Sequence, residues 1–183
     1  MKTNLETAIV GGGCFWCTEA IFQEIKGVEK VISGYSGGTV PGEPTYREIC
    51  SGLTGHAEVI EITFDNTIIS YIDILVIFMT THDPTTLNQQ GADRGTQYRS
   101  VIFYQNEQQK EVSEKVIEQL TPYFDAKIVT EISPFTIFYK AGIEHQNFYQ
   151  KNSEQAYCTF VIDPKLLKLR QLHKNKLKKS KVI

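Results

Sequence analysis

The chain has 183 residues, of which 41% are hydrophobic and 22% are charged, and its formal net charge is −2. This length and composition are typical of one soluble globular domain and argue against disordered, collagen-like and coiled-coil chains. No apolar run reaches the roughly 18 residues of a membrane span, and no signal-peptide pattern precedes the first glycines. We therefore expect a cytoplasmic protein with no membrane partner.

The basic residues are distributed unevenly along the chain. Residues 165–183 contain eight Lys or Arg residues and no acidic residue. A basic segment of this kind can bind nucleic acid, but no aromatic side chain lies among these lysines to stack on bases. We expect one folded domain over residues 1–164, a solvated basic tail over residues 165–183, and no nucleic-acid partner.

Strands and helices follow one another along the whole chain. Short apolar or alternating segments predict strands near residues 7–10, 28–35, 56–64, 98–105, 127–131 and 135–139. Helical spacing predicts helices over residues 14–26, 70–82, 106–120 and 144–155, with Ser70 and Asn106 as the capping residues of the second and third. We expect an α+β fold: a two-layer sandwich with a mixed sheet, arranged as a ferredoxin-like plait and followed by a long C-terminal coil.

The four cysteines indicate redox or metal chemistry, because disulfide scaffolds are rare in reducing compartments. They are Cys14, Cys17, Cys50 and Cys158. A structural zinc site normally needs a second pair of ligands, and only Cys14 and Cys17 form a C-x-x-C pair. We therefore expect no metal.

Cys14 follows three glycines and begins a predicted helix. Free N–H groups and the positive end of the helix dipole favour a thiolate at this position. Cys17 lies on the same helical face, close enough for a strained disulfide. The pattern indicates a nucleophilic or redox-active cysteine; the alternative is a pair of buried cysteines at a helix start.

Glu58 is the second candidate. The alternation in residues 56–64 places Ile60 and Phe64 on one face of a strand, and the same period places Glu58 on that apolar face. Burial would raise the pKa of its carboxyl and allow it to donate a proton near neutral pH. The alternative is that strand pairing begins after Glu58 and that its side chain reaches water.

Six motifs together resemble the A-type peptide methionine sulfoxide reductases. They occur in the family's order between residues 7 and 160, and are GCFW (13–16), PTYRE (44–48), CSG (50–52), TGHAE (54–58), HDP (82–84) and DRGTQYRS (93–100). The resemblance implies the family's α+β sandwich, with a glycine-rich catalytic turn at the start of the first helix. It makes residues 1–164 the catalytic domain of an oxidoreductase.

The resemblance implies reduction of the S epimer of methionine sulfoxide, protein-bound or free, in the repair of proteins damaged by oxidative stress. Cys14 matches the nucleophile, which becomes a sulfenic acid, and Phe15 and Trp16 match the apolar wall for the substrate methyl group. The groups that hold and protonate the sulfoxide oxygen, and an acidic residue that supports them, match Glu58, Tyr46, Tyr98 and Asp93. By themselves, tyrosines in polar loops are more often packing residues.

A second cysteine then forms a disulfide with Cys14, and the resemblance implies that thioredoxin reduces it. Cys17 is favoured by its proximity on the helix, and Cys158 by its similarity to the C-terminal recycling cysteines of some relatives; a relay can use both. We interpret Cys50 as structural. No metal or organic cofactor is required, and we expect a monomer.

Two other functions fit parts of the pattern. A thioredoxin-like dithiol oxidoreductase would use Cys14 and Cys17 on general disulfides, but it has no evident need for Trp16 or Glu58. A methionine-sulfoxide-binding or redox-sensing module would use the same groups without turnover.

Overall fold

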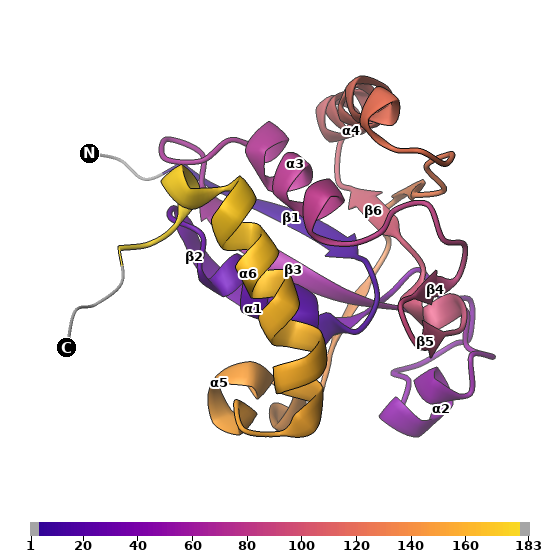
Figure 1. Ribbon diagram of the computed structural model, residues 1–183. Helices are drawn as coiled ribbons and strands as arrows, with labels where there is room; N and C mark the ends of the chain where they lie inside the picture. Colours follow the sequence, from indigo (N-terminus) through magenta and orange to yellow (C-terminus); the bar gives the residue numbers. More distant parts are fainter. Residues whose placement is uncertain (1–3, 180–183) are drawn as a thin grey trace.

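The computed structural model describes residues 4–179, which form a curled sheet covered by helices (Figure 1). The sheet has six strands in the order β7-β6-β1-β3-β2-β8. The β6–β7 pair is parallel and the other pairs are antiparallel, so the predicted mixed sheet is confirmed. The strands are β1 (Leu5–Gly11), β2 (Val28–Ser36), β3 (Ala57–Asp65), β6 (Val101–Tyr104), β7 (Glu131–Pro134) and β8 (Phe138–Lys140).

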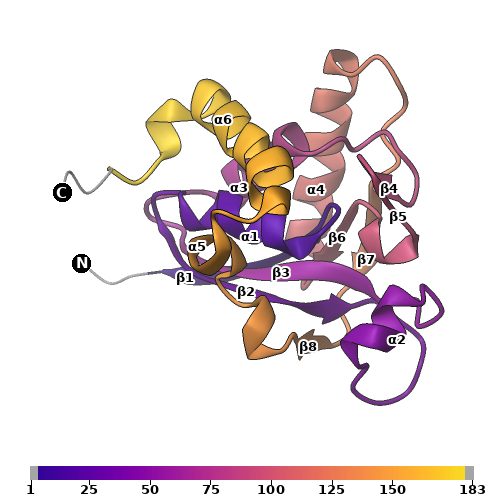
Figure 2. The same cartoon turned by 60° about the horizontal axis from the view of Figure 1, so that its bottom comes forward.

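The longer helices lie on one side of this sheet (Figure 2). They are α1 (Phe15–Gln23), α3 (Tyr71–Thr81), α4 (Glu107–Leu120) and α6 (Asp163–Leu172). The short elements are the helices α2 (Tyr46–Cys50) and α5 (Phe148–Asn152), the hairpin β4 (Gln89–Gln90) and β5 (Asp93–Arg94), and five short helical turns, of which Cys158–Ile162 is a wide π-turn and the others are 3₁₀ turns. The turns span Thr96–Tyr98, Thr121–Tyr123, Ile143–His145, Cys158–Ile162 and Lys174–Lys176.

The main core fills the space between the sheet and these helices. The alternation predicted on β3 is observed, since Ile60, Ile62 and Phe64 are fully buried and face Phe22 of α1 and its neighbours. Burial of one such side chain contributes roughly 1.5–3 kcal/mol. A smaller cluster covers the opposite face, formed by Ile9, Ala57, Val59, Val101 and Phe103 together with Phe135 and Phe138.

The predicted capping residues begin two of the helices. Ser70 and Asp73 form a reciprocal capping box at the start of α3, and Asn106 accepts the Gln109 N–H at the start of α4. The first helix is shorter than predicted, because α1 ends at Gln23 rather than next to Gly27. The predicted strands near 127–131 and 135–139 lie further along the chain, as β7 and β8.

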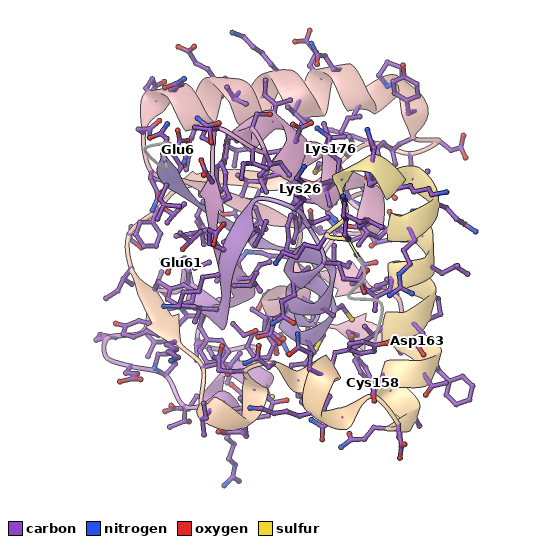
Figure 3. The ribbon with its side chains drawn as sticks, turned by 90° about the vertical axis from the view of Figure 1, so that its left-hand side faces the viewer. Glu6, Lys26, Glu61, Cys158, Asp163 and Lys176 are labelled. Carbon is purple, nitrogen blue, oxygen red and sulfur yellow. The ribbon has the colours of Figure 1, made fainter. Side chains whose placement is uncertain are left out.

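The C-terminal segment is helical, so the predicted long C-terminal coil is not confirmed. Leu166 and Leu169 of α6 are buried in the main core, and Leu177 pairs with Ile25. The Lys26 N–H donates to the Lys176 carbonyl at 2.8 Å, and Figure 3 shows these residues close together. Leucines at helical spacing therefore anchor the described part of the basic segment, despite its charge. Residues 180–183 of the predicted tail lie outside the described residues.

Candidate active site

Cys14 lies at the N-terminal end of α1, directly after a glycine turn that follows β1. Gly13 has a φ of +92°, and a Cβ atom there would come within 2.6 Å of the Gln90 side chain. Only glycine adopts this conformation without strain, so the turn depends on it. The turn leaves the Cys14 side chain largely buried, with an exposed fraction of 7%.

Glu58 points inward from β3, on the face that the alternation predicts. Its exposed fraction is 1%, and its Oε2 accepts a hydrogen bond from the Phe15 N–H at 3.0 Å. Burial raises the pKa of Glu58 to about 8; Asp93 also raises it, while the Phe15 N–H lowers it. The carboxyl is therefore protonated at neutral pH and can donate to a bound oxygen.

Three tyrosines lie within the electrostatic reach of Glu58. The Glu58 charge adds to burial in raising the pKa values of Tyr35, Tyr46 and Tyr98 above their usual range. Coulombic interactions weaken with distance, so these groups gather around one carboxyl. Tyr35 is the cross-strand partner of Glu58, and its buried hydroxyl has no hydrogen-bond partner within residues 4–179. All three tyrosines are neutral hydrogen-bond donors at pH 7.

The resting Cys14 thiol is protonated. Burial raises its pKa well above the usual value, and the charges of Glu58 and Cys17 raise it further. The raised pKa contradicts the expectation of a stabilised thiolate at the helix start in the free protein, and desolvation is the largest cause of it. The Tyr157 side chain and the Trp16 backbone lower the pKa of Cys14 in opposition to burial.

An aromatic wall stands beside Cys14. The Trp16 ring stacks on Phe148, with centroids 3.6 Å apart and planes 5° apart. The His145 ring lies 5.4 Å from the Phe15 ring and 4.5 Å from the Tyr46 ring. His145 and Phe148 come from the segment after β8, and their part in the wall was not predicted from the sequence.

Glu19 attaches that segment to α1. This carboxylate is buried and accepts the N–H groups of Asn147 and Phe148, at 2.8 and 3.1 Å. Asn147 has a left-handed backbone with a φ of +55°, so the chain turns sharply directly before α5. Glu19 therefore positions Phe148 against Trp16.

Asp93 is joined to the cysteines by Tyr157, which the sequence analysis did not single out. The Tyr157 hydroxyl donates to Asp93 Oδ2 at 3.1 Å and lies 3.8 Å from Cys17 Sγ. The Tyr157 ring meets the Trp16 ring edge-on, with centroids 5.6 Å apart. Its neighbour along the chain, Cys158, was the only signal in the sequence that pointed to this position.

The four cysteines occupy different environments. Cys17 and Cys158 are buried, and Cys50 is exposed at the end of α2, next to Tyr46. The Cys17 N–H donates to the Cys14 carbonyl at 3.1 Å. Cys158 begins the turn that leads into α6 (Figure 3). Burial raises the pKa of Cys158, and the charges of Asp163 and Cys17 raise it further, so Cys17 lies within electrostatic reach of Cys158.

Residues 4–179 contain no group of three or more His, Cys, Asp or Glu side chains arranged to hold a metal ion. No helix in the same range has the length and apolar character needed to cross a membrane.

Comparison with known proteins places the chain among relatives with the same motifs. The family model described as peptide methionine sulfoxide reductase matches residues 6–178. The peptide methionine sulfoxide reductase MsrA of Saccharolobus solfataricus is 52% identical over 174 residues, which cover 95% of this chain and 98% of the relative.

Solved structures agree with that match. Methionine sulfoxide reductase A of Corynebacterium diphtheriae superposes with a TM-score of 0.78 at 36% identity, covering 83% of this chain and 77% of the other. Reduced Mxr1 from Saccharomyces cerevisiae gives a TM-score of 0.78 at 31% identity, with coverages of 86% and 92%. Mxr1 has also been solved in complex with Trx2; that structure shares the fold, with a TM-score of 0.55 at 22% identity and coverages of 81% and 89%. The chain therefore belongs to the peptide methionine sulfoxide reductase family.

Proposed function

We propose that this protein reduces the S epimer of methionine sulfoxide, protein-bound or free, with Cys14 as the nucleophile. The observation that carries the proposal is the pairing of a buried thiol with a buried, neutral carboxyl. Glu58 accepts the N–H of Phe15, the residue next to Cys14, and its pKa is raised to about 8. The names of the relatives support the same activity.

The chemistry follows from the weakness of a sulfoxide as an electrophile. Its sulfur accepts a nucleophile only when its oxygen is hydrogen-bonded or protonated. Glu58 donates its proton to that oxygen, and the hydroxyls of Tyr46 and Tyr98 stabilise the negative charge that develops there. Phe15 and Trp16 hold the methyl group.

Cys14 attacks the substrate sulfur, and its thiol proton restores the proton on Glu58. The oxygen moves from the methionine sulfur to the Cys14 sulfur as a hydroxyl group. Methionine leaves with its sulfur reduced by two electrons, and Cys14 becomes a sulfenic acid.

Cys17 resolves the sulfenic acid in this proposal, because it lies one helical turn from Cys14. The product is a Cys14–Cys17 disulfide and one water. Cys158 lies within electrostatic reach of Cys17 and can take over the disulfide by exchange, after which thioredoxin reduces it. The complex of the yeast relative Mxr1 with Trx2 supports such a partner.

Several broader features belong to the same proposal. The reaction requires no metal or organic cofactor, and it suits a monomeric cytoplasmic enzyme that repairs oxidised proteins. The strand order β6-β1-β3-β2 and its helical crossovers support a ferredoxin-like plait at the centre of the sheet. Residues 1–164 form the catalytic domain in this proposal, and the described part of the basic segment, residues 165–179, packs on it rather than binding a partner.

A single-turnover experiment tests the function. The reduced protein is mixed with one equivalent of a peptide containing (S)-methionine sulfoxide, without reductant, and methionine release is followed with the intact mass and a disulfide map. We expect one methionine per protein and a Cys14–Cys17 bond, or the Cys17–Cys158 bond that forms from it by exchange. Cys14→Ser should release none, and Cys50→Ser is the matched control because Cys50 is exposed at the end of α2.

The alternatives give different results in that experiment. Cys17→Ser should still release one methionine and accumulate the sulfenic acid, whereas a general dithiol oxidoreductase would lose its activity. A binding or sensing module would release no excess of methionine over protein when dithiothreitol is added.

A further inference from the structure

The hydroxyl of Tyr157 lies between a thiol and a carboxylate. It donates its only proton to Asp93 Oδ2 at 3.1 Å. Its oxygen lies 3.8 Å from Cys17 Sγ, within hydrogen-bonding distance for sulfur. When the phenol proton points to Asp93, the Cys17 thiol is the group that donates the second bond. The three groups form a directed chain, Cys17 S–H to Tyr157 O–H to Asp93.

We propose that Tyr157 and Asp93 form a proton relay that deprotonates Cys17 when it resolves the Cys14 sulfenic acid. This inference rests on the proposed function, which supplies the sulfenic acid. In it, Tyr157 and Asp93 act in the formation of the Cys14–Cys17 disulfide, after methionine has left.

The step balances in atoms and electrons. Cys17 sulfur attacks Cys14 sulfur, the S–S bond forms and the S–O bond of the sulfenic acid breaks. The Cys17 proton moves to the Tyr157 oxygen while the Tyr157 proton moves to Asp93. The departing hydroxide takes a proton from Glu58 and leaves as water. Cys17 is oxidised and Cys14 is reduced, so no external oxidant is needed, and solvent returns both carboxyls to their resting states.

The position of Cys17 explains why a relay is useful. Burial raises the pKa of its thiol, so few molecules carry the thiolate at neutral pH. The Lys165 ammonium of α6 stabilises the thiolate once it forms, but an ammonium has no lone pair to accept the proton. The ionisable groups around Cys17 on the packed elements are Cys14 of α1, Asp93 of β5, Tyr157, Cys158 and Lys165.

Tyr157→Phe tests the relay, because the ring stays against Trp16 while the hydroxyl is lost. In single turnovers of the full-length protein, methionine release and Cys14–Cys17 disulfide formation are timed separately by acid quench and mass. We expect the ratio of the disulfide rate to the methionine rate to fall at least tenfold at pH 6.5, on the scale of about 10²–10⁴ for a lost general base.

The pH profile separates a relay from mere packing. In the wild type the Cys17 proton passes to Asp93 inside the protein, so the disulfide rate should change little between about pH 6 and 7, where Glu58 still carries the proton that the departing hydroxide needs. In Tyr157→Phe, Cys17 must lose its proton to solvent first, and the rate should rise nearly tenfold per pH unit. A purely structural role would lower the rate by the same factor at every pH and would overturn the proposal.

Asp93→Asn gives a second test, because the amide still accepts the Tyr157 hydroxyl but cannot take its proton. The same steep profile is expected; a flat one overturns the relay even if Tyr157→Phe folds poorly. Tyr149→Phe is the matched control, since it removes a hydroxyl that donates to Asp163 at 2.6 Å, and both rates should keep their wild-type values. Absent methionine release in the wild type would instead refute the proposed function.

Discussion

The backbone N–H of Phe15 donates a hydrogen bond to Glu58 Oε2 at 3.0 Å. This bond joins the first turn of α1 to the middle of the sheet across 43 residues of sequence. It fixes the carboxyl next to Cys14 and leaves the second carboxyl oxygen for a proton. The positions of Cys14 and Glu58 relative to each other are therefore set by the backbone at the start of α1 and by the register of β3.

Glu58→Gln should lower the rate of methionine release by about 10²-fold or more, the scale of a lost general acid. The amide keeps the shape of the side chain and can still accept the Phe15 N–H, so folding should survive. Single-turnover methionine release measures the effect. Glu61→Gln changes the same atoms on the outward face of β3 and should leave the rate unchanged.

The pH dependence of methionine release is a second test of Glu58. The pKa of Glu58 is about 8, so the wild-type rate of methionine release should fall as pH rises through that value. Glu58→Gln has no proton to lose there, and its low residual rate should show no such fall. Wild-type activity that persists undiminished well above pH 8 would contradict the role of Glu58 as the acid.

The raised pKa of Glu58 also affects stability. Its folded pKa of about 8 exceeds the unfolded value near 4.5, so the folded state binds a proton more tightly. The associated stability is complete below pH 4.5 and is lost as pH rises to about 8. The free energy of unfolding of Glu58→Gln minus that of the wild type should therefore increase by about 1.4 kcal/mol per pH unit within this window.

Urea unfolding of both proteins at pH 5, 6.5 and 8 measures this difference. Glu61→Gln corrects for the loss of one carboxylate from the surface of β3 (Figure 3). Parallel stability curves for the wild type and Glu58→Gln would mean that the carboxyl is ionised in the folded protein, and would remove its role as a donor.

Gly13→Ala should nearly abolish activity and destabilise the protein. Gly13 has a φ of +92°, and its new methyl group would lie 2.6 Å from Gln90, so the turn that orients Cys14 must shift. Gly42→Ala is the matched control, because Gly42 has a φ of +90° with no atom within 4 Å of the added carbon. The left-handed backbone should destabilise both variants by about 1–2 kcal/mol. Only Gly13→Ala should also lose methionine release.

Sequence patterns predicted the features that depend only on residues close together in the chain. The alternation over residues 56–64 predicted both β3 and the inward orientation of Glu58, because a strand has a period of two wherever it lies. Ser70 and Asn106 predicted the starts of α3 and α4, since capping needs only neighbouring N–H groups. The three glycines before Cys14 likewise predicted the turn on which it lies, because the conformation of a turn depends on its own residues.

The sequence could not predict groups that long-range folding brings to the site. Tyr157, His145 and Phe148 belong to a segment in which the helix predicted over residues 144–155 is reduced to the short α5 between turns, and the path of this segment over α1 depends on tertiary contacts. The raised pKa of Cys14 is another such property: the helix start is visible in the sequence, but the burial that outweighs it is not. The C-terminal leucines have a spacing that fits a short amphipathic helix, but the lysines among them favoured the prediction of a solvated tail.

Glu19→Gln should loosen the aromatic wall without removing any part of it. An amide offers one acceptor oxygen in place of two, so one of the N–H groups of Asn147 and Phe148 loses its partner in a buried place, at a cost of about 1–3 kcal/mol. Phe148 then holds Trp16 less firmly, and KM for a peptide sulfoxide should rise several-fold while kcat changes less.

Fluorescence reports this change directly, because Trp16 is the only tryptophan in the chain. Loss of the 3.6 Å stack on Phe148 should shift its emission to longer wavelength as water reaches the ring. Glu24→Gln is the control on the same helix, since its partner Arg170 lies at the surface and such pairs contribute about 0–1 kcal/mol. If Glu19→Gln keeps the wild-type emission and KM, then Glu19 serves the stability of the fold alone and the wall is held by its own packing.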